Sequence, residues 1–328
     1  MMFFIKYVIF LFNKFARLTV FVNNKLYFFS LIFMDIPVKK LKCGFTLPIF
    51  GFGTWQMGGR DTRNPENDDI ADINAIKNAI ELGITHFDTA EFYAEGFAEK
   101  LLSKAIKGYD RSGLIITTKV SPMNFHYNDL IKSLNQSLER IGTDYIDIYL
   151  MHAPNPYIPI AESMEAMDYL INKKLIKHIG LSNFDTSQFS EAQKCTNNKI
   201  VCNHVHYNLK YRLPQQDGSI KYAQSNDIMV VAWRPVQKGL FAAERNDLLD
   251  SMCLKYNKTP SQIAINWIIS QDNLTVITKC RSLEHLKENM GALGWQMEKK
   301  DIDLLTYSFP DLKFSSDTKT LTDKIKPE

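Results

Sequence analysis

Long apolar runs, cysteine motifs and an excess of one charge are all missing from this chain of 328 residues. The five cysteines, Cys43, Cys195, Cys202, Cys253 and Cys280, are odd in number and include no Cys-x-x-Cys or Cys/His metal spacing. We therefore expect free thiols in a reducing compartment and no metal site. The net charge is only +3, with both signs interspersed, so no nucleic-acid partner is expected.

A glycine-rich phosphate loop is also missing. Gly51-Phe-Gly53 and Gly58-Gly59 occur, but no Gly-x-Gly-x-x-Gly lies between a strand and a helix. An open, doubly wound dinucleotide-binding sheet is therefore the weaker architecture. No Pro- or Ser-rich linker divides the chain into domains.

Residues 1–33 are apolar and basic, yet no run in them approaches the roughly 18 to 20 apolar residues that span a bilayer. Four basic residues interrupt the stretch: Lys6, Lys14, Arg17 and Lys25. No small-residue cleavage site follows a compact apolar core. We interpret the segment as an extension outside the fold, with Met34 as the expected start, and a basic amphipathic helix on a membrane surface as the alternative. No membrane partner and a cytoplasmic location are expected.

The chain alternates short β-rich apolar runs with segments of helical periodicity. Eight runs of this kind are found, at residues 49–54, 84–88, 114–120, 145–152, 178–183, 200–207, 228–233 and 274–279. Between two of them, Ile73, Ile76 and Ala79 recur at helical spacing. Strand followed by helix, repeated eight times, predicts an α/β protein built as a single (β/α)₈ TIM barrel. The barrel is expected over residues 34–310, followed by a short polar tail at 311–328.

Glycines lie between several predicted helices and the strands that follow them. Gly83, Gly113 and Gly142 hold this position. A left-handed residue commonly ends a helix there, so positive φ angles are expected at all three.

Four polar residues lie at the carboxyl ends of predicted strands or just beyond them: Asp88, Tyr93, Lys119 and His152. Carboxyl ends of barrel strands converge on one rim, so these side chains are expected to share a pocket. A lysine beside a tyrosine favours the phenolate and eases loss of its proton. Asp88 would be the counter-ion of a buried Lys119, and His152 would donate to an oxygen that gains negative charge. Each residue alone would more often be structural, but the four together predict a site that protonates a carbonyl oxygen.

Five strings surround these residues: Gly51-Phe-Gly-Thr-Trp55, Phe87-Asp-Thr-Ala-Glu-Phe-Tyr93, Thr118-Lys119, Leu150-Met-His152 and Gly180-Leu-Ser-Asn-Phe184. In this order they resemble the aldo-keto reductase family, from about Ile36 to Pro310. The strings Glu288-Asn289-x-x-Ala292-Leu293 and Ser308-Phe-Pro310 most resemble its prokaryotic branch of methylglyoxal and diketogulonate reductases. The resemblance implies a single barrel that binds NADPH or NADH without a Rossmann motif and reversibly reduces aldehydes or ketones. It also implies that Tyr93 is the general acid, that Lys119 and Asp88 tune it, and that His152 orients the carbonyl.

The resemblance also implies residues that contact the nicotinamide. Ser182 and Asn183 match residues that bond its carboxamide, and His204 stands near a usual glutamine. Trp233 matches the aromatic residue that stacks on the ring. Other expected contacts with the cofactor are Gly53, Thr54, Trp55, Asp88, Arg234, Pro235 and Asn289.

At the adenosine end, Lys279 and Arg281 suit a 2′-phosphate, which favours NADP(H) over NAD(H). The alternative is that both are ordinary solvated charges. Near them, Thr278 and Cys280 replace the proline and serine of many family members.

Aromatic residues are expected to line the pocket mouth: Trp55, Phe92, Phe125 and Tyr157. The polar tail is not expected to cover them, so the pocket should suit small aldehydes and dicarbonyls such as methylglyoxal. Two alternatives are open: an NADPH-binding redox sensor or regulatory subunit with slow turnover, and a reductase of pyridoxal or of a sugar or keto acid. For the latter, Arg234 is a candidate anion contact. We expect a monomer or homodimer.

Overall fold

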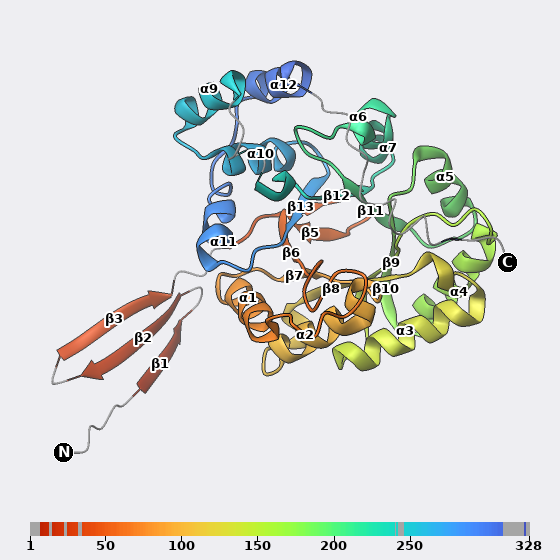
Figure 1. The fold of residues 1–328 in the computed structure, drawn as a ribbon, viewed down its shortest axis with the longest axis horizontal. Helices are drawn as coiled ribbons and strands as arrows, with labels where there is room; N and C mark the ends of the chain where they lie inside the picture. Colours follow the sequence, from red (N-terminus) through yellow and green to blue (C-terminus); the bar gives the residue numbers. More distant parts are fainter. Residues whose placement is uncertain are drawn as a thin grey trace.

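The computed structural model describes residues 7–12, 15–22, 25–31, 35–239, 241, 246–310 and 325. At its centre, eight parallel strands close a barrel in the order β10-β11-β12-β13-β6-β7-β8-β9 (Figure 1). The strands are β6 Phe50–Gly53, β7 His86–Asp88, β8 Ile115–Val120, β9 Ile146–Met151, β10 Ile176–Ser182, β11 Ile200–His206, β12 Met229–Trp233 and β13 Leu274–Thr278. Each overlaps one predicted run, so the (β/α)₈ barrel is confirmed.

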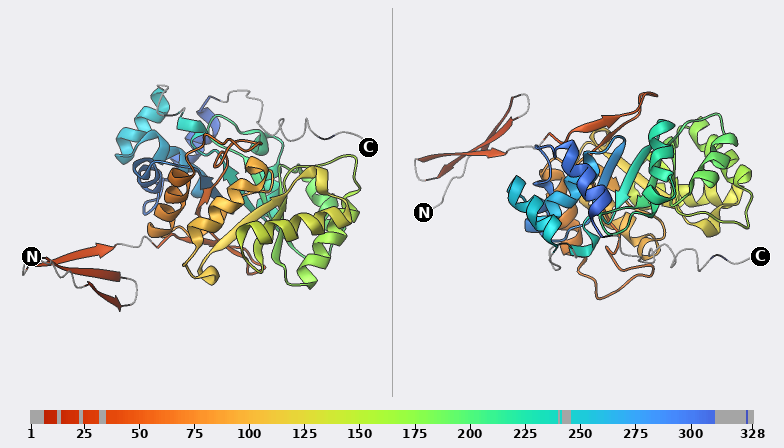
Figure 2. Two further views of the ribbon diagram at one scale, coloured as in Figure 1. Left: turned by 60° about the horizontal axis from the view of Figure 1, so that its bottom comes forward. Right: turned by 90° about the horizontal axis from the view of Figure 1, so that it is seen from above.

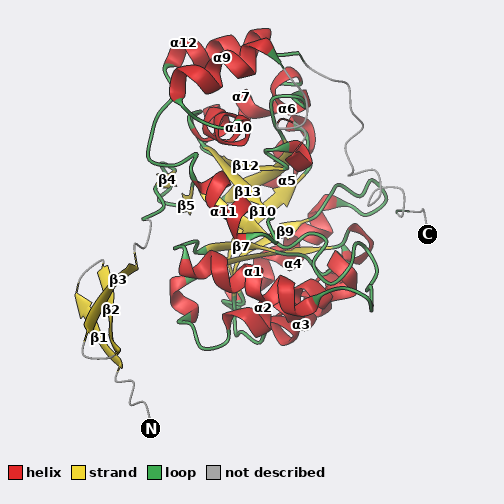
Figure 3. Ribbon diagram, turned by 60° about the vertical axis from the view of Figure 1, so that its left-hand side comes forward, coloured by secondary structure: helices red, strands yellow, loops and turns green. Residues whose placement is uncertain are grey.

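Helices surround the barrel strands, as Figure 3 shows in red around yellow. Those that follow the strands are α1 Asp69–Glu81, α2 Phe97–Ile106, α3 Tyr127–Ile141, α4 Ile160–Asn172, α5 Thr186–Lys194, α7 Ser219–Ser225, α10 Pro260–Ile269 and α11 Leu283–Met290. Additional helices are α6 Leu213–Gln216, α9 Asp247–Tyr256 and α12 Lys299–Ser308, with 3₁₀ turns η1 Tyr93–Gly96, η2 Arg111–Gly113, η3 Pro122–Asn124 and η4 Gln237–Gly239. The helical periodicity has the expected cause: α3, for example, buries Leu130, Leu134 and Leu138 on one face.

Glycines end two helices as predicted and a third differently. Gly83 and Gly142 have φ angles of +92° and +73°. Gly113 does not have a positive φ, because it ends the 3₁₀ turn η2. Gly108, with φ of +94°, follows α2 instead. The expectation for Gly113 was therefore wrong, since helix α2 ends earlier in the sequence than the glycine pattern indicated.

A small hairpin that the sequence analysis did not predict closes one end of the barrel. It consists of β4 Val38–Lys40 and β5 Thr46–Pro48, paired antiparallel. Phe45 and Leu47 pack with residues inside the barrel such as Val231. In the right-hand view of Figure 2, the hairpin lies over one end of the barrel and the chain after β6 over the other. The hairpin directly precedes β6, so it covers the amino ends of the strands, and the chain after β6 borders their carboxyl ends.

The N-terminal segment forms strands. β1 Tyr7–Phe12, β2 Phe15–Val22 and β3 Lys25–Leu31 make a separate antiparallel sheet, red in Figure 1. The alternative of an amphipathic helix was therefore wrong for these residues, whose β-branched and aromatic content favours strands. The start at Met34 stays a prediction, as do the cytoplasmic location and the oligomeric state. None of the described helices is long and apolar enough to cross a membrane. The predicted polar tail lies outside the described residues except at Ile325.

Candidate active site

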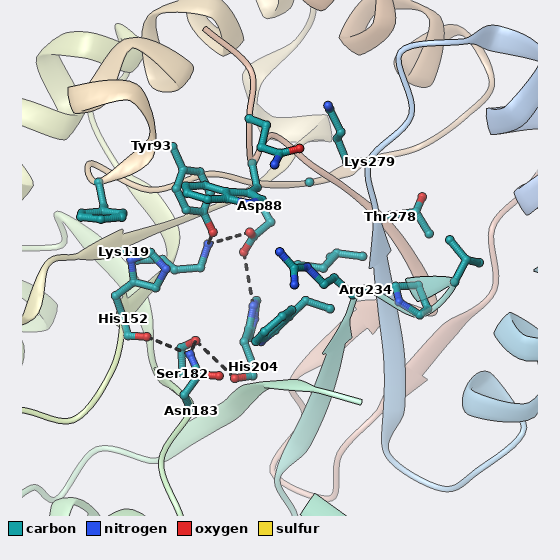
Figure 4. A pocket seen from close by; sticks show the side chains of 18 residues that line it. Asp88, Tyr93, Lys119, His152, Ser182, Asn183, His204, Arg234, Thr278 and Lys279 are labelled. Carbon is teal, nitrogen blue, oxygen red and sulfur yellow. Dashed lines mark hydrogen bonds and ion pairs between the residues drawn. The ribbon is translucent and has the colours of Figure 1, made fainter. Parts of the chain in front are cut away.

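The four polar residues predicted from the strand ends meet at the open end of the barrel (Figure 4). Asp88 ends β7, Lys119 lies in β8, His152 follows β9 and Tyr93 begins η1. The Lys119 ammonium donates to Asp88 Oδ1 at 2.6 Å and lies 3.0 Å from Tyr93 Oη. All four side chains are buried, at most 9% exposed. A buried lysine thus joins a carboxylate to a phenol.

Backbone contacts hold this group in place. Lys119 also donates to the carbonyl oxygen of Thr89, at 2.8 Å. The backbone N–H and the hydroxyl of Thr54 both donate to the carbonyl of Asp88, at 2.9 and 3.1 Å. Directly after Tyr93, Ala94 and Glu95 have left-handed φ angles of +50° and +56°. Such backbone conformations are costly for residues other than glycine, so this turn is held by the contacts around it.

Burial and charge determine the protonation of the group. Burial alone would raise the pKa of Asp88, but Lys119 and His204 together hold this pKa well below its usual range. For Lys119, burial lowers the pKa, and the raising effects of Asp88 and Tyr93 outweigh it. For Tyr93, burial raises the pKa more than Lys119 lowers it. The sequence argument considered only the lysine and missed this larger effect of burial.

Burial disfavours the charged form of three histidines in and beside the barrel strands. Burial lowers the pKa of His86 to about 3 and the pKa of His152 well below 6.5. Burial also lowers the pKa of His204, although Asp88 opposes this. The Nδ1 atom of His204 lies 3.3 Å from Asp88 Oδ2, so this carboxylate lies between a lysine and a histidine.

We expect the free energy of unfolding to fall as the pH is lowered from 7 to 5. An unfolded histidine titrates near 6.5, whereas the pKa of His86 in the fold is about 3. Between these values the unfolded chain binds more protons. The stability contributed by neutral His86 is therefore complete above pH 6.5 and is lost, by up to about 1.4 kcal/mol per pH unit, as the pH falls toward 3. Urea unfolding at several pH values measures the slope, which His86→Asn should reduce; an unchanged slope in this variant would contradict the assignment.

A pocket lies beside the tetrad and gathers most of the predicted cofactor residues. Those that line it are Gly53, Trp55, Asp88, Ser182, Asn183, His204, Trp233, Arg234, Pro235 and Lys279. Phe92, predicted for the substrate, also lines it. Gln56, Val236, Ile277 and Thr278 line it too and were missed as contacts, although each lies within two positions of a predicted residue in the sequence.

One wall of the pocket is held by stacked rings. The ring of Trp233 stacks on His206 at 4.3 Å between centroids, and His206 stacks on Tyr211 at 4.1 Å. Asn208 donates to His206 and to the carbonyl of Arg234, which has a φ of +56°. Because His206 covers one face of Trp233, the indole is held in one orientation.

Five predicted residues do not line this pocket. Thr54 lies behind Asp88, and Asn289 is buried with its amide 3.1 Å from the sulfur of Cys280. Arg281 is paired with Asp72. Phe125 is only 1% exposed because it packs in the core between barrel and helices, whereas Tyr157 is 52% exposed before α4. The sequence shows an aromatic residue after each of the strands β8 and β9 but does not give the direction of its side chain.

Comparison with known proteins decides the family. The model of the aldo/keto reductase family matches residues 50–307 of the chain. The chain is an aldo/keto reductase. The methylglyoxal reductase YeaE of Escherichia coli is similar to this aldo/keto reductase, with 29% identity over 81% of this chain and 92% of the relative.

Solved structures agree with this aldo/keto reductase in fold. The thermostable aldo-keto reductase Tm1743, in complex with the inhibitor epalrestat, matches with a TM-score of 0.78 and 36% identity over 82% of this chain and 98% of that one. An aldo/keto reductase from Klebsiella pneumoniae, in complex with NADP and acetate, matches with a TM-score of 0.74 and 28% identity over 85% and 97% of the two chains. The resemblance drawn from the strand-end motifs is confirmed.

Proposed function

We propose that this aldo/keto reductase uses NADP(H) to reduce aldehyde or ketone carbonyls, with Tyr93 as general acid. The observation that carries the proposal is the buried contact, at 3.0 Å, between Tyr93 Oη and Lys119 Nζ within the pocket. Burial raises the pKa of Tyr93, so the hydroxyl keeps its proton at neutral pH and can donate it to a carbonyl oxygen. Lys119 would stabilise the phenolate left behind, and Asp88 holds Lys119 charged.

His152 would orient the carbonyl. Its ring lies edge-on to Tyr93, with 5.4 Å between centroids, and lines the same pocket. Burial lowers its pKa well below 6.5, so the imidazole is neutral. A neutral imidazole can donate one hydrogen bond to the substrate oxygen while Tyr93 supplies the proton.

The residues present fit a nicotinamide cofactor. His204 Nε2 and Thr278 Oγ1 are buried, and neither has a hydrogen-bond partner among the described residues. Both residues line the pocket, so a polar ligand would satisfy them. His204 would hold the carboxamide with Ser182 and Asn183, while Trp233 would stack on the ring. When bound, NADPH supplies the hydride.

The adenosine end of the cofactor would lie near Lys279, which lines the pocket beyond β13. Its ammonium suits the 2′-phosphate that distinguishes NADPH from NADH. The bound NADP of the Klebsiella relative supports the same choice.

Small carbonyl compounds such as methylglyoxal are the proposed substrates. Trp55 and Phe92 stack at 6.4 Å and make an apolar wall facing the tetrad. The pocket therefore offers one polar corner in apolar surroundings, which suits a small aldehyde or dicarbonyl. The name of the Escherichia coli relative, a methylglyoxal reductase, supports this class.

A second candidate substrate is an anionic carbonyl compound. Arg234 lines the pocket, with its guanidinium 5.4 Å from the Trp233 ring centroid. A guanidinium there could hold the carboxylate of a keto or sugar acid, or instead a cofactor phosphate.

We expect the purified full chain to oxidise NADPH fastest with methylglyoxal, in a panel that also contains benzaldehyde, a sugar aldehyde, pyridoxal and a keto acid. A kcat/KM above about 10⁴ M⁻¹s⁻¹ is ordinary for an enzyme on its substrate. The measurement is loss of nicotinamide absorbance at 340 nm, repeated with NADH. Faster turnover of the keto acid would favour the second candidate. Tight NADPH binding with negligible turnover of every compound would contradict the reductase and favour the redox sensor.

A further inference from the structure

Arg281, which the sequence assigned to the 2′-phosphate, is held by the buried carboxylate of Asp72 in α1. Its Nε donates to Asp72 Oδ1 at 2.6 Å and its Nη2 to Asp72 Oδ2 at 3.1 Å. Asp72 lies in α1 and is fully buried, whereas Arg281 follows β13 and is 42% exposed. A fork of two parallel bonds between guanidinium and carboxylate is a directional contact.

The same two residues make hydrogen bonds to the loop between β6 and α1. Asp72 Oδ2 accepts from the backbone N–H of Gly58 at 3.0 Å and from the Asn67 amide at 2.8 Å. Arg281 Nη2 donates to Asn67 Oδ1 at 2.6 Å and to the carbonyl of Gln56 at 3.3 Å. Both ends of the segment 56–67 are thus tied to one guanidinium.

This pair joins the chain after β6 to the chain after β13, and both segments contribute to the cofactor pocket. Trp55 and Gln56 follow β6, whereas Thr278 ends and Lys279 follows β13, the neighbouring strand of the barrel. Figure 4 shows Thr278 and Lys279 at the edge of the pocket beside β13. Arg281 comes two residues after Lys279 and reaches the carbonyl of Gln56. Moving segment 56–67 away from the end of β13 therefore requires breaking the contacts of Arg281.

We propose that Arg281 and Asp72 form a latch that holds segment 56–67 against the end of β13 and sets how slowly a nicotinamide dinucleotide leaves the pocket. The latch acts on NADPH and NADH alike, because its guanidinium is engaged by Asp72 rather than by the 2′-phosphate. Discrimination between the two cofactors falls to Lys279. Arg281 is thus a positioning residue, which holds segment 56–67 and does not contact the 2′-phosphate. The inference rests on the cofactor site described under the proposed function.

Dissociation rates of both cofactors test the latch. We expect Arg281→Gln to speed the release of NADPH and of NADH by a similar factor, about tenfold, since a charged bidentate contact is lost. Arg281→Lys keeps the positive charge but cannot make the two parallel hydrogen bonds to Asp72. This variant should therefore also speed the release of both cofactors. Lys279→Met should weaken the binding of NADPH and have little effect on the binding of NADH. Release is followed by stopped-flow fluorescence of the bound dihydronicotinamide, which does not depend on turnover.

A cycle of variants separates the latch from general damage to the fold. Asp72→Asn combined with Arg281→Gln should release cofactor no faster than the more severe single variant, as for one shared interaction. If Arg281→Gln fails to fold, Asn67→Ala is tested in its place, because it removes one neutral contact of the same guanidinium. It should speed the release of NADPH and of NADH by a smaller factor than that expected for Arg281→Gln. Thermal unfolding of each cofactor-free variant shows whether it is folded at the temperature of measurement.

Three results would overturn the proposal. Weaker NADPH binding with unchanged NADH binding in Arg281→Gln would mean that Arg281 contacts the 2′-phosphate directly. Unchanged release of both cofactors from folded variants would mean that the pair does not limit release. Failure of the unaltered chain to bind either dinucleotide would overturn the cofactor site itself and the latch with it, so the two failures are distinguishable.

Discussion

Replacing Tyr93 with phenylalanine is expected to lower kcat for carbonyl reduction by about 10²- to 10⁴-fold, the usual contribution of general acid catalysis. The variant keeps the ring, which packs 4.8 Å from Trp55 and 5.4 Å from His152, and removes only the hydroxyl that contacts Lys119. Cofactor affinity should change little because the ring still fills its place. Single-turnover kinetics and fluorescence titration with NADPH measure the two quantities.

Tyr149→Phe is the matched control for this experiment. Tyr149 is also fully buried, but it packs in the core between the barrel and the helices, and it does not line the pocket. Its hydroxyl has no hydrogen-bond partner among the described residues, so removing it should leave turnover unchanged. Undiminished turnover in Tyr93→Phe would rule out Tyr93 as the proton donor.

Replacing Lys119 with methionine should lower the rate by orders of magnitude and also destabilise the fold. The rate falls because the phenolate of Tyr93 loses its neighbouring ammonium while the Asp88 carboxylate, 2% exposed, remains nearby and disfavours it. Stability falls because one partner of a buried ion pair is removed, which typically costs about 3–5 kcal/mol. Turnover and urea unfolding are measured on the same preparation.

Two further variants separate rate from stability. Asp88→Asn combined with Lys119→Met leaves no isolated carboxylate, so it should recover part of the stability and none of the rate. Lys177→Met breaks a second lysine ion pair, the 2.8 Å contact with Asp147, which lies outside the pocket. Because Lys177 is half exposed, about 1 kcal/mol or less should be lost, with no change in rate. A normal rate in folded Lys119→Met would contradict the role given to the lysine.

The tetrad could be predicted from the sequence because its members stand at the ends of apolar runs or, for Tyr93, a few residues beyond one. Asp88 and Lys119 end apolar runs whose buried faces leave few other places for a polar side chain. The geometry of a closed parallel barrel then brings those ends together, so four local observations became one site. The pKa of Tyr93 could not be predicted in this way, because it depends on burial as well as on the neighbouring lysine.

The direction of side chains in the loops after the strands could not be predicted from the sequence. Phe125 and Phe92 both follow a barrel strand, yet one packs in the core and the other lines the pocket. Loops have no fixed period, so an aromatic residue in them carries no information on which way it points. The hairpin β4–β5 was missed for a related reason: its strands are three residues each, too short for alternation to be recognised.

The sequence by itself determined the strands and helices of the barrel, since continuous apolar runs and apolar periods of about 3.6 residues are satisfied by buried strands and by helices that bury one face. It also determined the family, through motifs at the strand ends. The pairing of Lys119 with Asp88 was predicted from the strand ends, but only the tertiary structure decided the partner of Arg281. Arg281 and Asp72 stand 209 positions apart and meet because the barrel closes between β13 and β6. The sequence shows that both residues are charged, but their pairing depends on which strands the fold places side by side.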